Sequence, residues 1–299
     1  MILVAGSANL DFVVRAPHIP APGETVLGRE FRTFPGGKGA NQAIACARAG
    51  GSRTAMLLAL GADPFAAPIE ESLRGAGVQL QLVRISDQPT GTAFICVSDD
   101  AENAITVAPG ANSHLRAAHL PPLDGVTHLL LQLETPLETV TAYARAAHAA
   151  GVKVVLNAAP ARALPRELVW LLDFIVVNIG ELAAVSGHQG STEECLERVD
   201  VPCVVVTLGD RGCCARVGGR LIMQDAFVVM PVDTTAAGDT FCGVLVASLS
   251  QGMPLADALR RANAAGALTC MKAGAQSSIP THAELEEFLQ GHRRSAGTR

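Results

Sequence analysis

The sequence predicts an α/β fold: a doubly wound, mostly parallel sheet flanked by helices, with a small additional β-sheet. Short apolar runs alternate with longer helical patterns along most of the 299 residues, which indicates a parallel sheet with crossover helices. The repeated βα units do not reach an eight-fold count, and this favours an open sheet over a barrel. Two further pairs of strand-like segments have no helix between them, and they predict the smaller sheet.

The main-sheet strands are expected where short apolar runs stand between turns. In chain order they are Ile2–Ala5, Thr54–Leu60, His128–Leu133, Val152–Leu156, Phe174–Val177 and Cys203–Leu208. Helices are expected in the longer segments between and after these strands. They are Lys38–Ala49, Pro64–Gly75, Leu137–Ala150, Gly180–Ser186, Asp239–Ser250, Leu255–Met271 and His282–Leu289.

Two regions interrupt the alternation of strands and helices. Their strand-like segments are Phe12–Arg15 with Val26–Thr33, and Thr90–Val97 with Ala104–Val107. They predict a small antiparallel sheet that stands off the main domain as a lid. A sheet with one face toward substrate leaves the other face needing cover, so dimerisation through it is a further expectation. The alternative is that these strands extend the main sheet.

We therefore expect one domain over residues 1–290. The lid strands lie within about residues 12–33 and 90–108, and residues 291–299 form a flexible tail. The N-terminal Met1–Ala5 is strand-like and lacks a basic region followed by a long apolar stretch. No signal peptide or membrane span is expected, and the expected compartment is the cytoplasm.

Composition excludes several classes of protein. Hydrophobic residues make up 49% and charged residues 17% of the chain, which excludes a disordered protein. The formal net charge is −5, aromatic residues make up only 4%, and the one basic run is His292-Arg293-Arg294. No nucleic-acid partner is therefore expected. The eight cysteines form no CxxC pair and no zinc-like spacing with histidine, so they are interpreted as small apolar core residues.

The segment Asp233–Gly243 combines a turn of small residues with the start of an apolar helix. Unpaired backbone N–H groups and the helix dipole favour an anion at such a helix start. Ala236, Ala237 and Gly238 are small enough to let a phosphate approach those amides. Asp239 places a carboxylate beside this pocket. A carboxylate base next to a phosphate site predicts transfer of a phosphoryl group onto a hydroxyl.

A glycine-rich segment, Gly36–Ala43, carries Lys38 and Asn41. Its glycines allow a close backbone approach at a helix start, and the two polar side chains add a cation and an amide. The spacing matches neither a Walker A loop nor GxGxxG. A glycine turn that only caps a helix explains the segment equally well.

Polar residues also follow the predicted strands, where open α/β sheets bind ligands. Asp11 can accept hydrogen bonds from two neighbouring sugar hydroxyls, although an Asx turn is the simpler alternative. Glu134 lines the same crevice or is a surface carboxylate. Asn178 and Glu181 have the spacing of a capping box, which we favour over a Mg²⁺ role on spacing alone. The run from Thr207 to Gly212 either holds a nucleotide or forms a hairpin turn.

Taken together, these segments resemble the ribokinase branch of the ribokinase-like (PfkB) carbohydrate kinase family. The resemblance spans roughly Ile2 to Leu289, with Asp233–Gly243 similar to the C-terminal signature and Gly36–Ala43 similar to the N-terminal glycine motif. Ala158–Arg162 and Gly274–Gln276 are similar to ribokinases in particular. The resemblance implies a ribokinase-like fold and ATP-dependent phosphorylation of a sugar's primary hydroxyl, position 5 for ribose.

The resemblance also implies roles for individual residues. Asp239 is the base, and Ala236, Ala237 and Gly238 form the anion hole. The positions implied to contact sugar are Asn9, Asp11, Gly37, Lys38, Gly39, Asn41 and Glu134. The positions implied to bind ATP are Asn178, Thr207, Leu208, Gly209, Asp210, Arg211, Gly212, Gly238 and Asn263.

Two metal ions are implied as well. Glu181 matches the acidic residue linked to Mg²⁺, through water. An activating monovalent cation, usually K⁺, is implied at Asp233, Thr235, Thr269, Lys272, Gly274 and Ser278, several of them through backbone carbonyls. Ile179 and Gly180 replace residues that are often polar in the family, and Thr235, Thr269 and Lys272 are not the commonest residues in the cation loops.

Ribose is the leading acceptor, and three alternatives stay open. Another kinase of the same family, acting on deoxyribose, a ketose or a nucleoside, would carry a similar aspartate and similar glycines. A non-catalytic sugar or nucleotide sensor on the same scaffold would not need the base that Asp239 provides. A dinucleotide-binding oxidoreductase is the most distant alternative, because GxGxxG is missing.

Overall fold

A computed structural model describes residues 1–100 and 102–296 of the chain. In this part of the chain a nine-stranded sheet has the order β13-β12-β11-β10-β9-β8-β1-β4-β5. Its strands are β1 (Ile2–Ala5), β4 (Thr54–Gly61), β5 (Gln79–Ile85), β8 (His128–Leu131), β9 (Lys153–Asn157), β10 (Phe174–Asn178), β11 (Cys203–Thr207), β12 (Cys213–Val217) and β13 (Arg220–Gln224). Neighbours from β11 to β5 pair in parallel, and β12 and β13 add an antiparallel edge.

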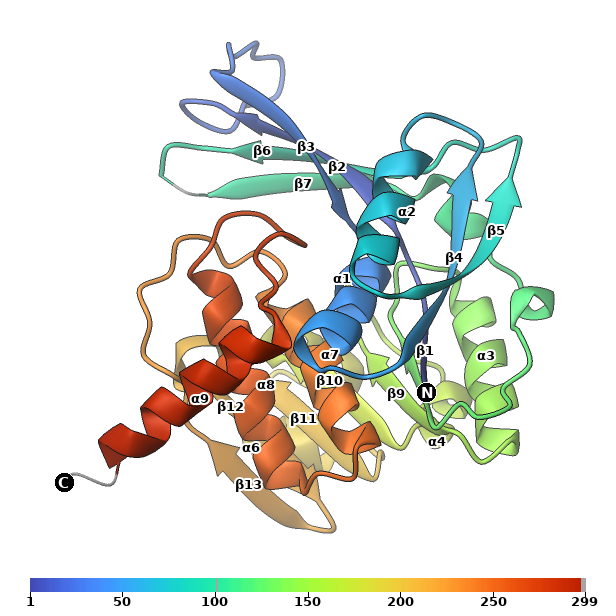
Figure 1. Ribbon diagram of the computed structural model, residues 1–299, viewed down its shortest axis with the longest axis vertical. Coiled ribbons are helices and arrows are strands. Elements are labelled where there is room, and N and C mark those ends of the chain that lie inside the picture. The colour runs from blue at the N-terminus through green and yellow to red at the C-terminus, as the bar shows by residue number, and fades with distance from the viewer. Residues whose placement is uncertain (101, 297–299) are drawn as a thin grey trace.

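Helices cover both faces of this sheet (Figure 1). On one face lie α1 (Lys38–Ile44), the π-helical turn η1 (Ala45–Ala49), α2 (Ala66–Gly75), α7 (Ala237–Ser250), α8 (Leu255–Cys270) and α9 (His282–Ala296). On the other lie α3 (Leu137–Ala149), α4 (Arg166–Trp170), α5 (Ile179–Ser186), α6 (Thr192–Glu197) and the 3₁₀ turn η2 (Gly110–His114). Two further 3₁₀ turns are η3 (Ala117–His119) and η4 (Gly209–Arg211). No helix in the described residues is long and apolar enough to cross a bilayer.

The central strands explain why both faces need cover. In β1, Ile2 and Val4 join the core on the α7 side, whereas Leu3 and Ala5 join the core on the α3 side. Successive side chains of a strand point to opposite faces, so a continuous apolar run makes both faces hydrophobic. The doubly wound sheet predicted from these runs is confirmed.

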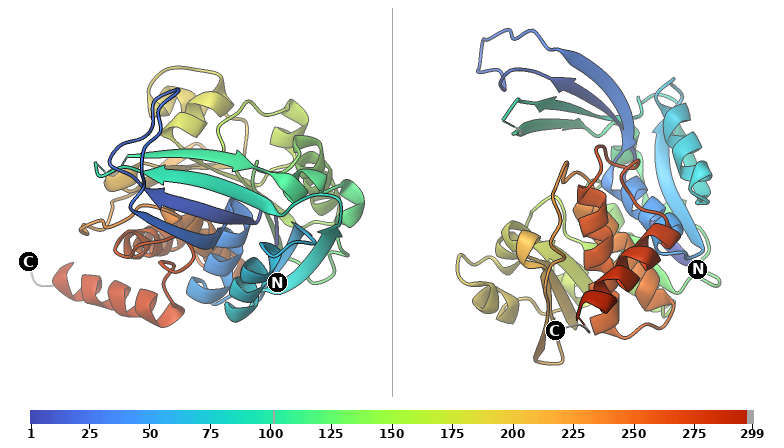
Figure 2. Two further views of the ribbon diagram at one scale, coloured as in Figure 1. Left: turned by 90° about the horizontal axis from the view of Figure 1, so that it is seen from above. Right: turned by 60° about the vertical axis from the view of Figure 1, so that its left-hand side comes forward.

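A second sheet stands off the layered domain (Figures 1 and 2). Its order is β3-β2-β6-β7, formed by β2 (Asn9–Arg15), β3 (Glu30–Gly36), β6 (Gly91–Val97) and β7 (Asn103–Ala108). It is separate from the main sheet, as expected from the missing helices. The two predicted strand pairs are antiparallel, but β2 and β6 pair in parallel at the centre. This parallel pair differs from the antiparallel pairing we expected throughout.

Several elements are absent from the sequence-based prediction. Strands β5, β12 and β13 lie toward the two edges of the main sheet, and β5 carries polar residues in alternation, so a search for continuous apolar runs misses it. The short helices α4 and α6 also went unpredicted. Helix α9 continues to Ala296, six residues into the expected tail, and residues 297–299 lie outside the described part of the chain.

Helix α7 packs against α1 and η1 through Gly243. A Cβ atom there would lie 2.5 Å from the Ala45 Cβ and 2.6 Å from the Gln42 carbonyl oxygen. We expect Gly243→Ala to lower the free energy of unfolding by about 1–3 kcal/mol, because the helices would have to separate. The matched control is Gly75→Ala in α2, where a Cβ meets no atom within 4 Å and the change should stay below about 1 kcal/mol.

Urea denaturation of both variants measures this difference. Equal stability of the Gly243 and Gly75 variants would show that α7 adjusts its position without cost, and would contradict the tight packing described here.

Candidate active site

Polar side chains gather at the carboxyl ends of the central parallel strands. Ser7 follows β1, Gln132 follows β8, and Asn157, Asn178 and Thr207 are the last residues of β9, β10 and β11. Because these strands run in the same direction, their ends share one edge of the sheet. This edge is where open α/β sheets bind ligands.

Helix α7 begins at this edge with an unusual turn. Its N-cap, Ala236, has a left-handed backbone (φ 61°) and is the only non-glycine residue with positive φ in the described chain. The Ala237 amide donates to the Thr234 carbonyl at 3.2 Å, so it is used inside the turn. The amides of Gly238 and Asp239 have no carbonyl acceptor among the described residues. These two free N–H groups and the helix dipole favour an anion.

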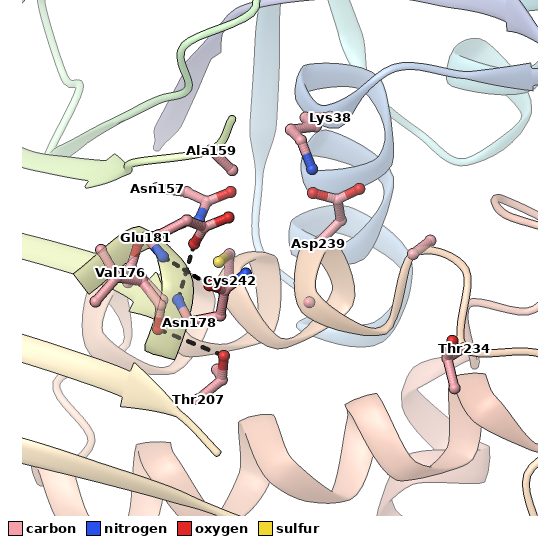
Figure 3. Close-up of a pocket in the computed structure, with 13 residues that line it drawn as sticks. Lys38, Asn157, Ala159, Val176, Asn178, Glu181, Thr207, Thr234, Asp239 and Cys242 are labelled. Carbon is pink, nitrogen blue, oxygen red and sulfur yellow. Dashed lines mark hydrogen bonds between the residues drawn. The ribbon is translucent and has the colours of Figure 1, made fainter. Parts of the chain in front are cut away.

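The Asp239 carboxylate is buried at this helix start and is held by two amides from α1. The Asn41 Nδ2 donates to Oδ2 and the Gln42 Nε2 donates to Oδ1, each at 2.9 Å. Figure 3 shows the Lys38 ammonium pointing toward the same carboxylate. Asp239 raises the pKa of Lys38 against the opposing effect of burial, and Glu134 and Glu181 raise it further. Lys38 therefore stays a cation beside Asp239.

The glycine motif fits tightly against the chain after β1. Gly37 has φ 88°, and a Cβ there would lie 2.8 Å from the backbone of Ala8 and Asn9. A Cβ on Gly39 would lie 2.7 Å from the Ser7 backbone. No larger residue fits at either position. Gly37 is the N-cap of α1, so the motif does cap a helix. The close packing of the motif also brings the start of α1 to the strand edge.

Glu134 lies beside the start of α1 and the chain after β1. Its Oε2 accepts from the Lys38 amide at 3.1 Å and from the Ser7 hydroxyl at 2.5 Å. A carboxylate at a helix N-terminus satisfies a free N–H group and interacts favourably with the dipole. Glu134 is therefore tied to the chain after β1 and to the start of α1.

Asp11 lies on the adjoining strand β2 and is buried. Burial, followed by the charges of Glu134 and Asp239, raises the pKa of Asp11 to about 7. Its carboxylate lies against Gly36 of β3, where a Cβ would come within 2.1 Å of Oδ2. The neighbouring Asn9 is held by Asn112, whose Nδ2 donates to the Asn9 Oδ1 at 2.8 Å. The charges of Glu134 and Asp239 thus act on Asp11, and a cluster of acceptors of this kind favours a ligand with several hydroxyl donors.

A cavity of about 230 Å³ opens beside Asp239 (Figure 3). It is lined by Lys38, Asn157, Ala159, Val176, Val177, Asn178, Glu181, Thr207, Thr234, Ala236, Gly238, Asp239 and Cys242. The capping box favoured on spacing is confirmed, since the Asn178 and Glu181 side chains each accept the other's amide at 2.8 Å. Burial raises the pKa of Glu181 and outweighs the hydrogen bond from the Asn178 amide, which lowers this pKa.

The segment from Thr207 to Gly212 forms the turn between β11 and β12. The Leu208 amide donates to the Gly212 carbonyl at 2.8 Å, and Gly212 has φ 93°. This is the hairpin alternative, and of these residues Thr207 alone lines the cavity. Asn263 on α8 donates to the Gln224 carbonyl at 3.2 Å, so it holds the end of β13.

The two loops expected to hold a monovalent cation are joined through Asp233. Its carboxylate accepts from the Thr235 and Gly274 amides, each at 2.9 Å. Burial opposes ionisation here, but these hydrogen bonds prevail and lower the pKa of Asp233. The Lys272 ammonium pairs with Glu284 of α9 at 2.7 Å. The hydroxyls of Thr269 and Ser278 both donate to backbone carbonyls.

Comparison with known proteins then fixes the family. The family model described as pfkB family carbohydrate kinase matches residues 1–282. The chain belongs to this family. The pfkB kinase described here is 38% identical to a ribokinase of Haemophilus influenzae, over 97% of this chain and 98% of the relative.

Solved structures agree with this assignment. The ribokinase of Thermotoga maritima superposes on this pfkB kinase with a TM-score of 0.88 at 36% identity, over 97% of this chain and 99% of the other. The ribokinase of Arabidopsis thaliana, solved with ribose and ATP, also has a TM-score of 0.88, at 30% identity over 97% of this chain and 98% of the other.

Some side chains at the centre of this pfkB kinase were not singled out from the sequence. Gln42 lies inside the glycine motif, yet no role was assigned to it. Ser7 and Gln132 just after strands, Asn157 at a strand end, and Asn112 in η2 were also missed. Polar residues directly after apolar strands were the available signal, but single amides and hydroxyls are common in turns.

Proposed function

We propose that this chain is an ATP-dependent sugar kinase and that its acceptor is ribose. The observation that carries the proposal is the Asp239 carboxylate, buried and oriented by Asn41 and Gln42, beside two free amides at the start of α7. A proton acceptor next to a site for negative charge is what phosphoryl transfer to a hydroxyl requires. The similarity to ribokinases, one of them solved with ribose and ATP, supports ribose as the acceptor.

In the proposed reaction Asp239 takes the proton of the primary hydroxyl. The hydroxyl oxygen forms a bond to the γ-phosphorus while the bond from that phosphorus to the β,γ-bridging oxygen breaks, so ADP leaves in line. The Gly238 and Asp239 amides and the Lys38 ammonium face the charge on the transferred group. The resemblance implies an anion hole at Ala236 to Gly238. We assign this anion hole to the free amides of Gly238 and Asp239 in the same turn.

The sugar is proposed to lie between the strand edge and the small sheet. The Asp11 carboxylate accepts two adjacent hydroxyls, and Glu134 and the Asn9 and Asn41 side chains complete the contacts. Gly37 and Gly39 are proposed to contact the sugar through their backbone, since their close packing on the chain after β1 brings the start of α1 to the strand edge. Lys38 itself lines the cavity, together with Glu181 and Thr207.

ATP is proposed to occupy that cavity and to contact the adjoining turn of the hairpin. Asn178 and Thr207 line the cavity, while the turn 208–212 and Asn263 border the expected nucleotide edge. Mg²⁺ would neutralise the phosphates. Glu181 fits an indirect contact through water, because its carboxylate is already engaged with the Asn178 amide yet still lines the cavity.

A monovalent cation is proposed between the loops at Asp233 and Gly274. The site fits backbone coordination, since the side chains of Thr269, Lys272 and Ser278 are engaged elsewhere. Bound there, K⁺ would add a fixed positive charge near the α7 helix start. Unchanged activity when K⁺ is replaced by a large organic cation would reject this site.

An acceptor panel tests the proposed function. ADP release is followed with ATP, Mg²⁺ and K⁺ and one acceptor at a time: ribose, 2-deoxyribose, a ketose and a nucleoside. We expect the highest kcat/KM with ribose. A higher value for another acceptor reassigns the substrate within the family. Tight sugar binding without ADP release with any acceptor supports the sensor and contradicts a kinase.

The small sheet is proposed to join two copies of the chain. Its face opposite Asp11 carries Phe31 and Phe94, which are 62% and 53% exposed and stack on Phe12 with ring centroids 6.1 and 5.4 Å apart. An exposed aromatic cluster of this kind marks an association surface. Sedimentation should show a dimer that Phe94→Asp converts to a monomer. A wild-type monomer at micromolar concentration would exclude it.

A further inference from the structure

A chain of buried side-chain amides runs behind Asp239, formed by Gln42, Asn157 and Gln132, and of these three only Asn157 lines the cavity. Gln42 is fully buried and does not line the cavity. Its Nε2 donates both to the Asp239 Oδ1 at 2.9 Å and to the Asn157 Oδ1 at 3.0 Å. Its Oε1 accepts from the Gln132 Nε2 at 2.6 Å. Every hydrogen-bonding group of the Gln42 amide group is therefore engaged except the second lone pair of its oxygen.

The orientation of each amide follows from an atom whose role is fixed. The Asn157 Nδ2 lies 3.1 Å from the Val176 carbonyl, which can only accept, so the Asn157 Oδ1 faces Gln42. Gln42 must then present its NH₂ group to this oxygen and to the Asp239 carboxylate. Its own oxygen faces Gln132, which must present an NH₂ group in turn. A flipped Gln42 amide would set its oxygen against two other oxygens.

The far end of the chain is held by packing. The Gln132 Oε1 is buried and has no hydrogen-bond partner among the described residues. A Cβ on Gly6 would lie only 1.8 Å from this oxygen, so the Gln132 side chain fills the space that glycine leaves. A buried oxygen without a partner costs free energy. Gln132 retains this unpaired oxygen because, in this orientation, its NH₂ group donates to the Gln42 oxygen.

We infer that Gln42 is a positioning residue for phosphoryl transfer. It fixes the orientation of the Asp239 carboxylate, and Asn157 and Gln132 fix the orientation of Gln42. The inference rests on the proposed function, because it assumes that Asp239 accepts the hydroxyl proton. Asn41 holds the other carboxylate oxygen from the sugar side, so Gln42 supplies the restraint that does not depend on substrate.

Gln42→Met removes the amide at similar volume and is the main test. We expect kcat at saturating ribose and ATP to fall by about 10–100-fold, because a misplaced base slows transfer. Neither KM should change by more than about threefold, since Gln42 lies outside the cavity lining. The acid limb of the pH profile of kcat should move to higher pH, because a carboxylate that loses a donor holds its proton more tightly.

The charged and titratable groups around Asp239 stay unchanged in this variant. They are Asp11, Lys38, Glu181 and Cys242. The control is Thr240→Val, one residue after Asp239, whose buried hydroxyl has no partner among the described residues. It perturbs the same helix turn without touching the amide chain, and kcat and its pH profile should stay unchanged.

Gln132→Met provides a second, independent variant. It leaves Gln42 in place but frees its amide, so kcat should fall by about 3–10-fold. In a Gln42→Met background it should have no further effect, because both changes break one chain. This variant also decides the question if Gln42→Met does not fold.

The outcomes distinguish a failure of the positioning role from a failure of the proposed function. An inactive Asp239→Asn protein together with wild-type kcat and pH profile in Gln42→Met overturns the positioning role and leaves the proposed function intact. Additive losses in the double variant also overturn it. An active Asp239→Asn protein overturns the proposed function itself.

Discussion

Asp239→Asn should lower kcat by about 10²–10⁴-fold, the usual contribution of a general base. The amide has nearly the shape of the carboxylate but cannot take the hydroxyl proton. It also presents an NH₂ group to one of its two donors, Asn41 or Gln42. We therefore expect a stability loss of about 1–3 kcal/mol with the fold retained. Steady-state kinetics and urea denaturation measure the two effects separately.

ATP binding should survive this substitution, because the nucleotide side of the cavity is unchanged. The control is Asp257→Asn, the same chemical change at an exposed position in the first turn of α8. It should leave kcat within about twofold. Near-normal turnover of the Asp239 variant would remove this residue from the role of base.

Asp11→Ala should raise the KM for ribose by about 10²–10⁴-fold and leave the KM for ATP nearly unchanged. A carboxylate that accepts two hydroxyls makes two charge-assisted hydrogen bonds, each worth about 1.5–3 kcal/mol. Asp11 lies on β2 of the small sheet and is not part of the cavity beside Asp239. Equal increases in both KM values would indicate a general folding defect instead.

The pKa of Asp11 adds a pH dependence to this prediction. Burial and the charges of Glu134 and Asp239 raise this pKa to about 7, so the carboxylate becomes protonated below that pH in the free protein. The ribose KM should rise by about tenfold for each pH unit well below 7, as the ionised fraction falls. Asp11→Asn should remove this slope, and a slope that persists in the variant would assign it to another group.

The same pKa has a consequence for stability, with the opposite sense. The folded chain binds a proton at Asp11 between its ordinary pKa of 3.8 and about 7, whereas the unfolded chain does not. The contribution of Asp11 to the free energy of unfolding therefore grows as pH falls from about 7 toward 4. Urea denaturation of wild type and Asp11→Asn across this range measures it.

The elements that the sequence predicts best are those whose burial is complete. Strand β1 is predicted with its observed bounds, and α7 begins within two residues of the prediction. Strand β5 and the hairpin of β12 and β13 were missed. These elements lie toward the edges of the sheet, and polar residues interrupt the apolar pattern in β5 and β13.

The residues of the candidate site also divide into those that the local sequence identifies and those that it does not. Asp239, Asp11 and the glycine motif could be singled out because their local context restricts what they can do. Gln42 and Asn157 could not, since they lie 115 positions apart and each is an ordinary amide until the other is placed beside it. The hydrogen bond from the Ala237 amide to the Thr234 carbonyl was likewise not predictable, because it depends on the geometry of the turn.

The order of apolar runs and small residues along the chain was sufficient to determine a two-faced sheet, a helix start suited to phosphate and the aspartate beside it. These are local properties, written in neighbouring residues. Folding decided which amides hold that aspartate, which backbone donors stay free and how far the Asp11 pKa rises. Such properties depend on distance, burial and charge between segments far apart in the sequence, and only the tertiary structure sets those distances.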